Sequence, residues 1–128
     1  MKKEVILTEN AALPKGPYSQ AIRAGNFLFL SGQGAWDSKT GKLLAHGDIT
    51  TQTEIIIKNV AAILKAGGSS IDNVVKVIVF INDLNNFSSF NNVYKKYFID
   101  NPPARSTVEI GNFEKGMCIE MDVIALVT

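Results

Sequence analysis

The sequence has 128 residues, of which 46% are hydrophobic and 20% are charged, and its net charge at neutral pH is +1. This balance is normal for a globular protein, and the length predicts one domain spanning residues 1–128 with its own core. Because the charges are scattered, the composition argues against nucleic acid or a membrane surface as a partner. No apolar stretch reaches the ~18 residues of a membrane span, and the N-terminus lacks the hydrophobic region of a signal peptide, so we expect a cytoplasmic protein.

The first part of the chain has the pattern of short strands separated by turns. Residues 4–8 are predicted to form a strand, and residues 13–17, with two prolines and a glycine, a turn-rich loop. Residues 19–24 and 27–32 flank the dipeptide Gly25-Asn26, which favours a tight turn. We therefore expect these two segments to form a hairpin.

A helix is predicted over residues 51–65. Thr51 and Glu54 have the spacing of a capping box, and Gly67-Gly68 follows the last apolar residue of the helical pattern. The next segment, residues 74–81, is β-branched and aromatic, which is typical of a strand.

A second helix is predicted to begin at Asn85 or Asn86 and to stop before Pro102-Pro103. Its apolar side chains recur on one face: Phe90, Val93, Tyr94, Tyr97 and Phe98. Residues 104–110 and 117–127 are the last two predicted strands. The order of strands and helices predicts an α+β domain with a sheet and two helices packed on one face.

The strands are apolar on both faces, which predicts an oligomer. In the strand 74–81, one face carries Val75, Val77, Val79 and Ile81, and the other carries Ile78 and Phe80. Two helices cover only one face of a sheet. The second apolar face is therefore expected to meet another subunit.

Arg105 is one of only two arginines and lies between a proline pair and an apolar run. If the last two strands form a hairpin, Arg105 lies opposite Asp122, and Thr107 lies opposite Glu120. A guanidinium binds a carboxylate bidentately, and a carboxyl beside an apolar wall can move the proton of a water molecule. The residue types leave a structural alternative open, in which Arg105 only pairs with one of the two acids across the strands.

Other polar side chains are weaker candidates when taken alone. Tyr18 and Ser31 can donate hydrogen bonds to a ligand, and Gly32 allows close backbone approach, but turn chemistry explains them equally well. Asn91 is either a ligand-binding residue or a solvated helix residue. A single cysteine and a single histidine leave no cluster of metal ligands and no clear nucleophile with its base.

Five motifs in this chain, taken together, resemble the Rid family, the reactive intermediate deaminases or YjgF-type proteins. The resemblance covers nearly the whole chain. The motifs are Gly16-Pro17-Tyr18-Ser19-Gln20-Ala21, Ser31-Gly32-Gln33, Asp83-Leu84-Asn85-Asn86-Phe87, Pro103-Ala104-Arg105-Ser106 and Ile119-Glu120-Met121-Asp122-Val123-Ile124-Ala125.

This resemblance implies a chorismate-mutase-like α+β subunit with a mixed sheet, assembled as a homotrimer with ligand sites between subunits. It also implies hydrolysis of reactive enamine and imine acids, such as 2-aminoacrylate, to 2-keto acids and ammonia, without a metal or cofactor. By the same resemblance, Arg105 binds the substrate carboxylate and Glu120 positions the attacking water. The remaining residues of the expected site, as side chains or backbone groups, are Tyr18, Ser31, Gly32, Asn91 and Thr107.

Two alternative functions stay open at the level of sequence. The first is a non-catalytic trimer that binds small carboxylates or keto acids, which needs Arg105 but not Glu120. The second is a ribonuclease or translation inhibitor, an activity also ascribed to the family, against which the absence of a continuous basic track argues. Some members carry cysteine where this chain has Thr107, so we expect the backbone at that position to matter more than its side chain.

Overall fold

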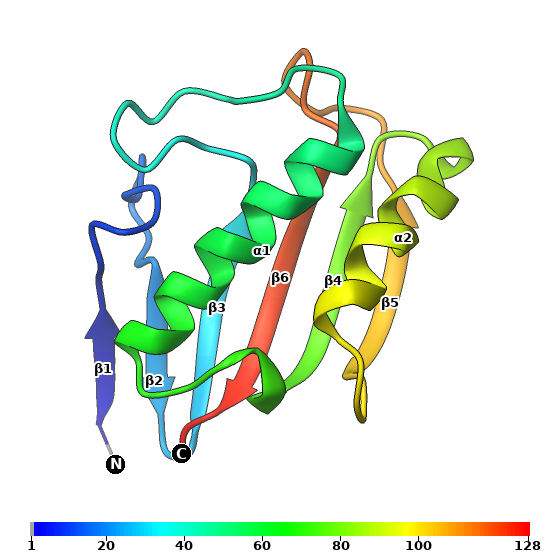
Figure 1. Cartoon of the computed structure of the whole chain (residues 1–128). Coiled ribbons are helices and arrows are strands. Elements are labelled where there is room, and N and C mark those ends of the chain that lie inside the picture. Colours follow the sequence, from blue (N-terminus) through cyan, green and yellow to red (C-terminus); the bar gives the residue numbers. More distant parts are fainter. Residues whose placement is uncertain (1) are drawn as a thin grey trace.

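The computed structural model describes residues 2–128, which form one six-stranded sheet with two α-helices across one face (Figure 1). The strands lie in the order β1-β2-β3-β6-β4-β5, and neighbouring strands are antiparallel except β4 and β5, which are parallel. This confirms the predicted α+β class with a mixed sheet. The elements are β1 (Lys3–Ile6), β2 (Ala21–Ala24), β3 (Phe27–Gln33), α1 (Ile49–Ala66), β4 (Val74–Ile81), α2 (Phe87–Tyr97), β5 (Ala104–Glu109) and β6 (Ile119–Leu126).

The predicted hairpin is present as β2 and β3. Ala24 pairs with Phe27 across the turn, and Gly25 has a φ of 59°, a left-handed conformation that glycine adopts without steric cost. No helix within residues 2–128 combines the length and apolar character needed to cross a bilayer.

Helix α1 starts at Ile49, before the predicted start, because its N-cap is Asp48. The Asp48 carboxylate accepts hydrogen bonds from the Thr51 N–H at 3.1 Å and the Thr51 hydroxyl at 2.6 Å. The predicted capping box is therefore wrong, since Thr51 lies inside the helix. The predicted end is confirmed: the N–H of Gly67 bonds to carbonyls of the last turn.

Helix α2 continues from a short 3₁₀ turn over Leu84–Asn86, and Asn86 is its N-cap residue. The Asn86 side chain makes no capping hydrogen bond; instead the carboxylate of Asp83 accepts the Asn85 N–H at 2.9 Å and caps the 3₁₀ turn. The helix ends at Tyr97, well before the proline pair. Its buried residues are Phe90, Val93 and Tyr94, all of them on the face predicted to be apolar.

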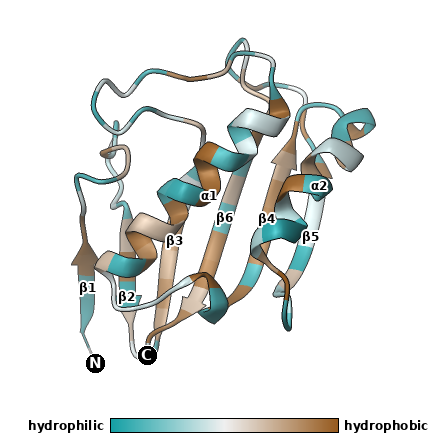
Figure 2. Ribbon diagram, in the orientation of Figure 1, coloured by the Kyte–Doolittle hydropathy of each residue, from teal (hydrophilic) through white to brown (hydrophobic). Residues whose placement is uncertain are grey.

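The core lies between the helices and one face of the sheet, where hydrophobic residues follow the central strands (Figure 2). Val77, Val79 and Ile81 of β4 are fully buried there, as predicted. Val75 is not. A bulge in the pairing of β4 with β6 leaves it 37% exposed, and Val74 occupies the buried position instead.

The second face of the sheet carries no helix and is rich in apolar side chains. Register places Ile78 and Phe80 of β4 on this open face with Glu120 and Asp122 of β6. Several large side chains of the face are exposed: Val5 (59%), Phe27 (41%), Phe29 (43%), Val108 (43%) and Leu126 (40%). No segment within residues 2–128 covers this apolar face.

Two buried glutamines hold the loops above the sheet. Gln52 of α1 donates to the carbonyls of Ala45 at 3.0 Å and Gly116 at 2.8 Å and accepts the Cys118 N–H at 2.8 Å. Gln20 accepts the Thr8 N–H at 2.8 Å and so ties down the segment that leads to Tyr18. The loops lack regular backbone hydrogen bonds at these points, and the glutamine amides satisfy their N–H and C=O groups instead. These bonds fix the positions of the loops.

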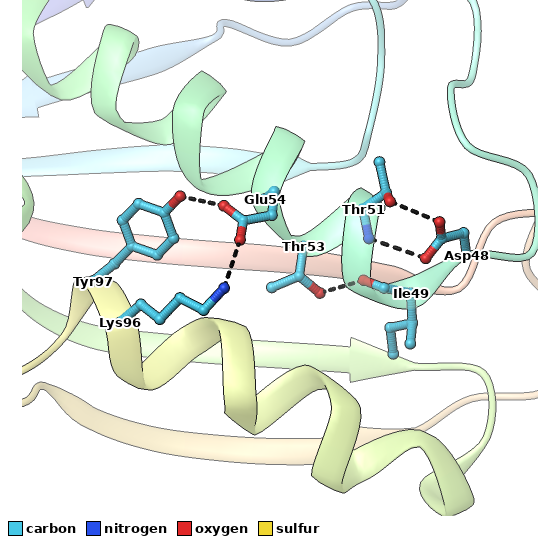
Figure 3. A network of polar contacts seen from close by, with 7 residues as sticks. All are labelled: Asp48, Ile49, Thr51, Thr53, Glu54, Lys96 and Tyr97. Atoms are coloured by element: carbon cyan, nitrogen blue, oxygen red, sulfur yellow. Dashed lines mark hydrogen bonds and ion pairs between the residues drawn. The ribbon is translucent and has the colours of Figure 1, made fainter.

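A polar contact joins the two helices (Figure 3). The Tyr97 hydroxyl of α2 donates to the carboxylate of Glu54 on α1, and the Lys96 ammonium lies 3.3 Å from the same carboxylate. The hydrogen bond from Tyr97, together with Lys96, lowers the pKa of Glu54. This contribution to stability is therefore present above the ordinary pKa of a glutamate and is lost as the pH falls through the lowered value.

Tyr97→Phe is expected to lower the free energy of unfolding by about 1 kcal/mol at neutral pH, because it removes this one hydrogen bond from a carboxylate. For a domain of this size, the melting temperature should fall by about 4 °C. Thermal unfolding followed by circular dichroism measures the change. The same comparison at a pH below the lowered pKa of Glu54, where its carboxyl group is protonated, should show a smaller difference. Equal melting temperatures at neutral pH would contradict the interpretation.

Candidate functional site

The last two strands do not form the predicted hairpin, because β4 lies between β5 and β6. Arg105 of β5 is opposite Val77 in the parallel pair, and Glu120 of β6 is opposite Phe80 in the antiparallel pair. Val77 faces the helices and Phe80 faces the open side. Arg105 and Glu120 therefore lie on opposite faces of the sheet, and the predicted neighbourhood of the two side chains within one chain is wrong.

The order strand, helix, strand explains the correction. β4, α2 and β5 form a crossover unit, and such units place their two strands side by side and parallel. The free edge of β4 then remains for β6, which enters antiparallel to it. This pattern was present in the predicted elements and favours the observed pairing over a hairpin.

Arg105 lies against aromatic side chains of α2. Its guanidinium carbon is 4.7 Å from the ring centroid of Tyr94, 5.1 Å from that of Phe90 and 5.5 Å from that of Phe87. These rings lie on one side of the helix, and cation–π attraction holds the guanidinium over them. Within residues 2–128, Arg105 forms no ion pair with a carboxylate, so the structural alternative of a pair with Glu120 or Asp122 is not what the chain adopts.

The guanidinium borders an open cleft of about 500 Å³ between α2 and the start of β5. The cleft is lined by Asn91, Tyr94, Lys95, Phe98, Pro102, Pro103 and Arg105. We call it the anion cleft, because two cations and an amide border it and no acidic side chain lines it. The structure thus places Asn91 and Arg105, both predicted site residues, in one cleft.

Thr107 lies two residues beyond Arg105 on β5, the edge strand of the sheet. The Ile110 N–H donates to the Ile81 carbonyl at 2.9 Å, so even-numbered residues turn their backbone groups toward β4. Strand alternation then turns the backbone N–H and C=O of Thr107 toward the free edge. These groups are available to a ligand or to another chain.

The other predicted site residues gather at β3 and β6. Ser31 donates its hydroxyl to the Ser19 carbonyl at 2.6 Å, and Tyr18 accepts the Lys15 N–H at 3.2 Å while remaining about half exposed. Tyr18 and Gly32 line the same small pocket. The segment around Tyr18 therefore packs along the end of β3.

Gly32 permits the approach of two acids. A Cβ atom at this position would lie 2.8 Å from Oε2 of Glu120 and 3.0 Å from Oδ1 of Asp122, so any other residue would make the two carboxyl groups shift. Burial raises the pKa of Glu120, and the neighbouring charge of Asp122 raises it further; burial also raises the pKa of Asp122. We call Gly32, Glu120 and Asp122 the carboxyl pair site.

Two neighbours in the site were not predicted from the sequence: Asp122 beside Glu120, and Tyr94 beside Arg105. The first follows from strand alternation, since residues two apart on β6 share a face. The second depends on how α2 crosses β5 and has no local signal. Within residues 2–128, no three His, Cys, Asp or Glu side chains come together as metal ligands.

Comparison with known proteins gives consistent matches over almost the whole chain. A protein-family model described as Endoribonuclease L-PSP matches residues 8–127. A RutC family protein of Pyrococcus horikoshii is 50% identical over 96% of this chain and 97% of its own length. The Reactive Intermediate Deaminase A of Arabidopsis thaliana chloroplasts is 42% identical over 98% of this chain and 66% of its own length.

A solved structure agrees with this relationship. The Rid family protein YyfA of Yersinia pestis is 43% identical, and the two folds superpose with a TM-score of 0.93 over 98% of this chain and 100% of that one. Sequence identity at this level over nearly the whole chain indicates a common family and not only a common fold. The chain therefore belongs to the Rid family, the group that the Endoribonuclease L-PSP model describes.

Proposed function

We propose that this chain is a deaminase of reactive enamine and imine acids, acting as one domain over residues 1–128 within a homotrimer of chorismate-mutase-like subunits. Its substrates are of the 2-aminoacrylate and 2-iminopropanoate type, and its products are 2-keto acids and ammonia. The observation that carries the proposal is the guanidinium of Arg105, which borders an open cleft and has no carboxylate partner within residues 2–128. The relationship to a protein named Reactive Intermediate Deaminase A supports it.

The anion cleft suits a small carboxylate. A guanidinium offers parallel N–H groups that match the two oxygens of a carboxylate, and within residues 2–128 no carboxylate pairs with those of Arg105. Asn91 adds an amide donor at the rim. The cleft thereby holds a substrate by its carboxylate, the group that all the proposed substrates share, while the reactive carbon projects from the cleft.

The trimer is proposed because the two halves of the site lie on opposite faces of one subunit. The open face exposes several large apolar side chains that a partner would cover, and a second copy of the chain has a face of the same chemistry. If the open face of one subunit packs beside the β5 edge of the next, the carboxyl pair site of one chain meets the anion cleft of another. Tyr18 and Ser31 would then line the wall of the cleft.

The chemistry requires positioning and proton transfer only. An imine carbon is electrophilic once its nitrogen is protonated. Glu120 as a carboxylate accepts a proton from water while the water oxygen adds to that carbon, and it returns the proton to the nitrogen. The C–N bond of the resulting carbinolamine then breaks while the Glu120 carboxylate accepts the proton of its hydroxyl group, which releases ammonia and leaves the 2-keto acid. Glu120 passes this proton to the departing ammonia or to water and is a carboxylate again. No covalent intermediate with the protein is needed, and the main contribution is orientation.

A non-catalytic carboxylate-binding trimer is the second candidate. It is favoured by the same free guanidinium, but it assigns no role to Glu120 or to the raised pKa of its carboxyl group. Turnover therefore separates the two candidates.

A coupled assay tests the proposed function. An amino-acid dehydratase generates the imine from serine or threonine, and formation of the keto acid is followed with and without this protein. We expect faster release of keto acid and ammonia when the wild-type protein is added, in proportion to its concentration. An unchanged rate at every concentration would sink the deaminase proposal and leave the binding candidate.

A further inference from the structure

Tyr94 carries the one side-chain polar atom among the described residues, 2–128, that is buried without a hydrogen-bond partner. Its hydroxyl oxygen has almost no accessible surface and makes no hydrogen bond of ordinary geometry with a described group, and the guanidinium of Arg105 is the charge that acts on it. Such atoms are rare in native proteins, and each calls for an explanation. The aromatic ring itself is well packed: it stacks on Phe98 at 4.3 Å between centroids and contacts Phe90 at 5.3 Å.

The groups around this hydroxyl are donors and rings. Arg105 and Lys95, which line the same cleft, have N–H groups but no acceptor, and Phe90 and Phe98 contribute ring faces. Burial raises the pKa of Tyr94 to about 12, and the positive charge and N–H groups of Arg105 oppose this rise. The phenol therefore keeps its proton at neutral pH and does not neutralise the guanidinium.

We propose that Tyr94 is the positioning residue of the anion cleft: its buried phenol oxygen accepts an N–H of Arg105 when a bound carboxylate fixes the guanidinium, and this keeps Arg105 turned toward the cleft. The inference rests on the proposed function for the identity of the ligand, a small carboxylate. An acid at this position would pair with Arg105 and remove its charge, and phenylalanine would support the guanidinium without orienting it. A neutral phenol orients Arg105 and leaves its charge to the ligand.

Tyr94→Phe tests the role, with pyruvate as the probe and a chemical-shift titration as the measurement. We expect the Kd for pyruvate to rise about tenfold, the effect of losing one hydrogen bond in a charged site. The melting temperature should stay the same or rise, because the substitution removes an unpaired buried hydroxyl. A merely structural tyrosine would give the reverse result: a lower melting temperature with an unchanged Kd.

Tyr97→Phe is the matched control, since Tyr97 lies on the same helix and bonds to Glu54 instead. It should lower the melting temperature and leave the Kd for pyruvate within twofold of the wild-type value. A second test uses Arg105→Lys as the background. If Tyr94 acts through the guanidinium fork, adding Tyr94→Phe to this variant should change the Kd less than twofold.

The outcomes distinguish this inference from the function on which it rests. Wild-type protein that binds pyruvate with an affinity that Tyr94→Phe leaves unchanged overturns the role of Tyr94 alone. A tenfold effect that persists in the Arg105→Lys background also overturns it. Wild-type protein that does not bind pyruvate overturns the carboxylate cleft, and the role of Tyr94 with it.

Discussion

Arg105→Ala is expected to reduce kcat/KM for the imine acid by about a hundredfold or more. The substitution removes a bidentate, charge-assisted contact with the substrate carboxylate, and a loss of about 3 kcal/mol corresponds to more than a hundredfold. Stability should change little, because Arg105 forms no ion pair within residues 2–128 and its cation–π contacts are worth about 1 kcal/mol. The dehydratase-coupled assay and thermal unfolding give the two measurements.

Arg23→Ala is the matched control, because it removes the other arginine from β2, away from the anion cleft. Its turnover should equal that of the wild type. Arg105→Lys should fall between, at about a tenfold loss, since lysine keeps the charge but not the planar fork. A wild-type rate for Arg105→Ala would show that the cleft does not hold the substrate.

The kind and position of most elements could be predicted from local patterns, whereas the order of strands in the sheet depends on how the elements follow one another along the chain. The segments at 104–109 and 119–126 show the same apolar alternation whether they pair with each other or with β4. The short connection between these two segments favoured a hairpin. The crossover through α2 instead places β5 beside β4, so β5 and β6 do not pair. Because side-chain neighbours across a sheet follow the strand order, this one choice decided where Glu120 lies relative to Arg105.

Some features of the candidate site could likewise be predicted from the sequence, and others could not. Arg105 and Asn91 come together because α2 crosses beside β5, and the sequence resemblance pointed to both. The aromatic support of the guanidinium depends on the packing of α2 against the sheet edge, which helical spacing alone does not determine: Phe90 and Tyr94 fit a core face equally well. In the proposed trimer a second subunit brings Glu120 beside Arg105, and a single sequence indicates such a partner only through an uncovered apolar face.

Glu120→Gln is expected to lower kcat by about a hundredfold or more while the Kd for pyruvate stays within about twofold of the wild-type value. Glutamine preserves size and polarity beside Gly32 but cannot accept and return a proton, and general acid–base catalysis contributes roughly 10²–10⁴-fold. Single-turnover measurements with freshly generated imine separate the chemical step from binding. Glu4→Gln, an exposed residue of β1, is the control and should leave both quantities unchanged.

The pH dependence gives an independent check on the same residue. Rate should increase as Glu120 loses its proton, and the raised pKa moves this limb of the profile above the usual range of a glutamate. Asp122 is the charged neighbour in the carboxyl pair site; Phe80 faces Glu120 from β4, and Lys76 lies farther along that strand, within 3.3 Å of Ser106. Asp122→Asn removes the negative charge that resists ionisation of Glu120, so the limb should move to lower pH with binding preserved. If Glu120→Gln retains the wild-type kcat, or Asp122→Asn leaves the profile in place, water activation belongs to another group and the chain is better described as a carboxylate-binding protein.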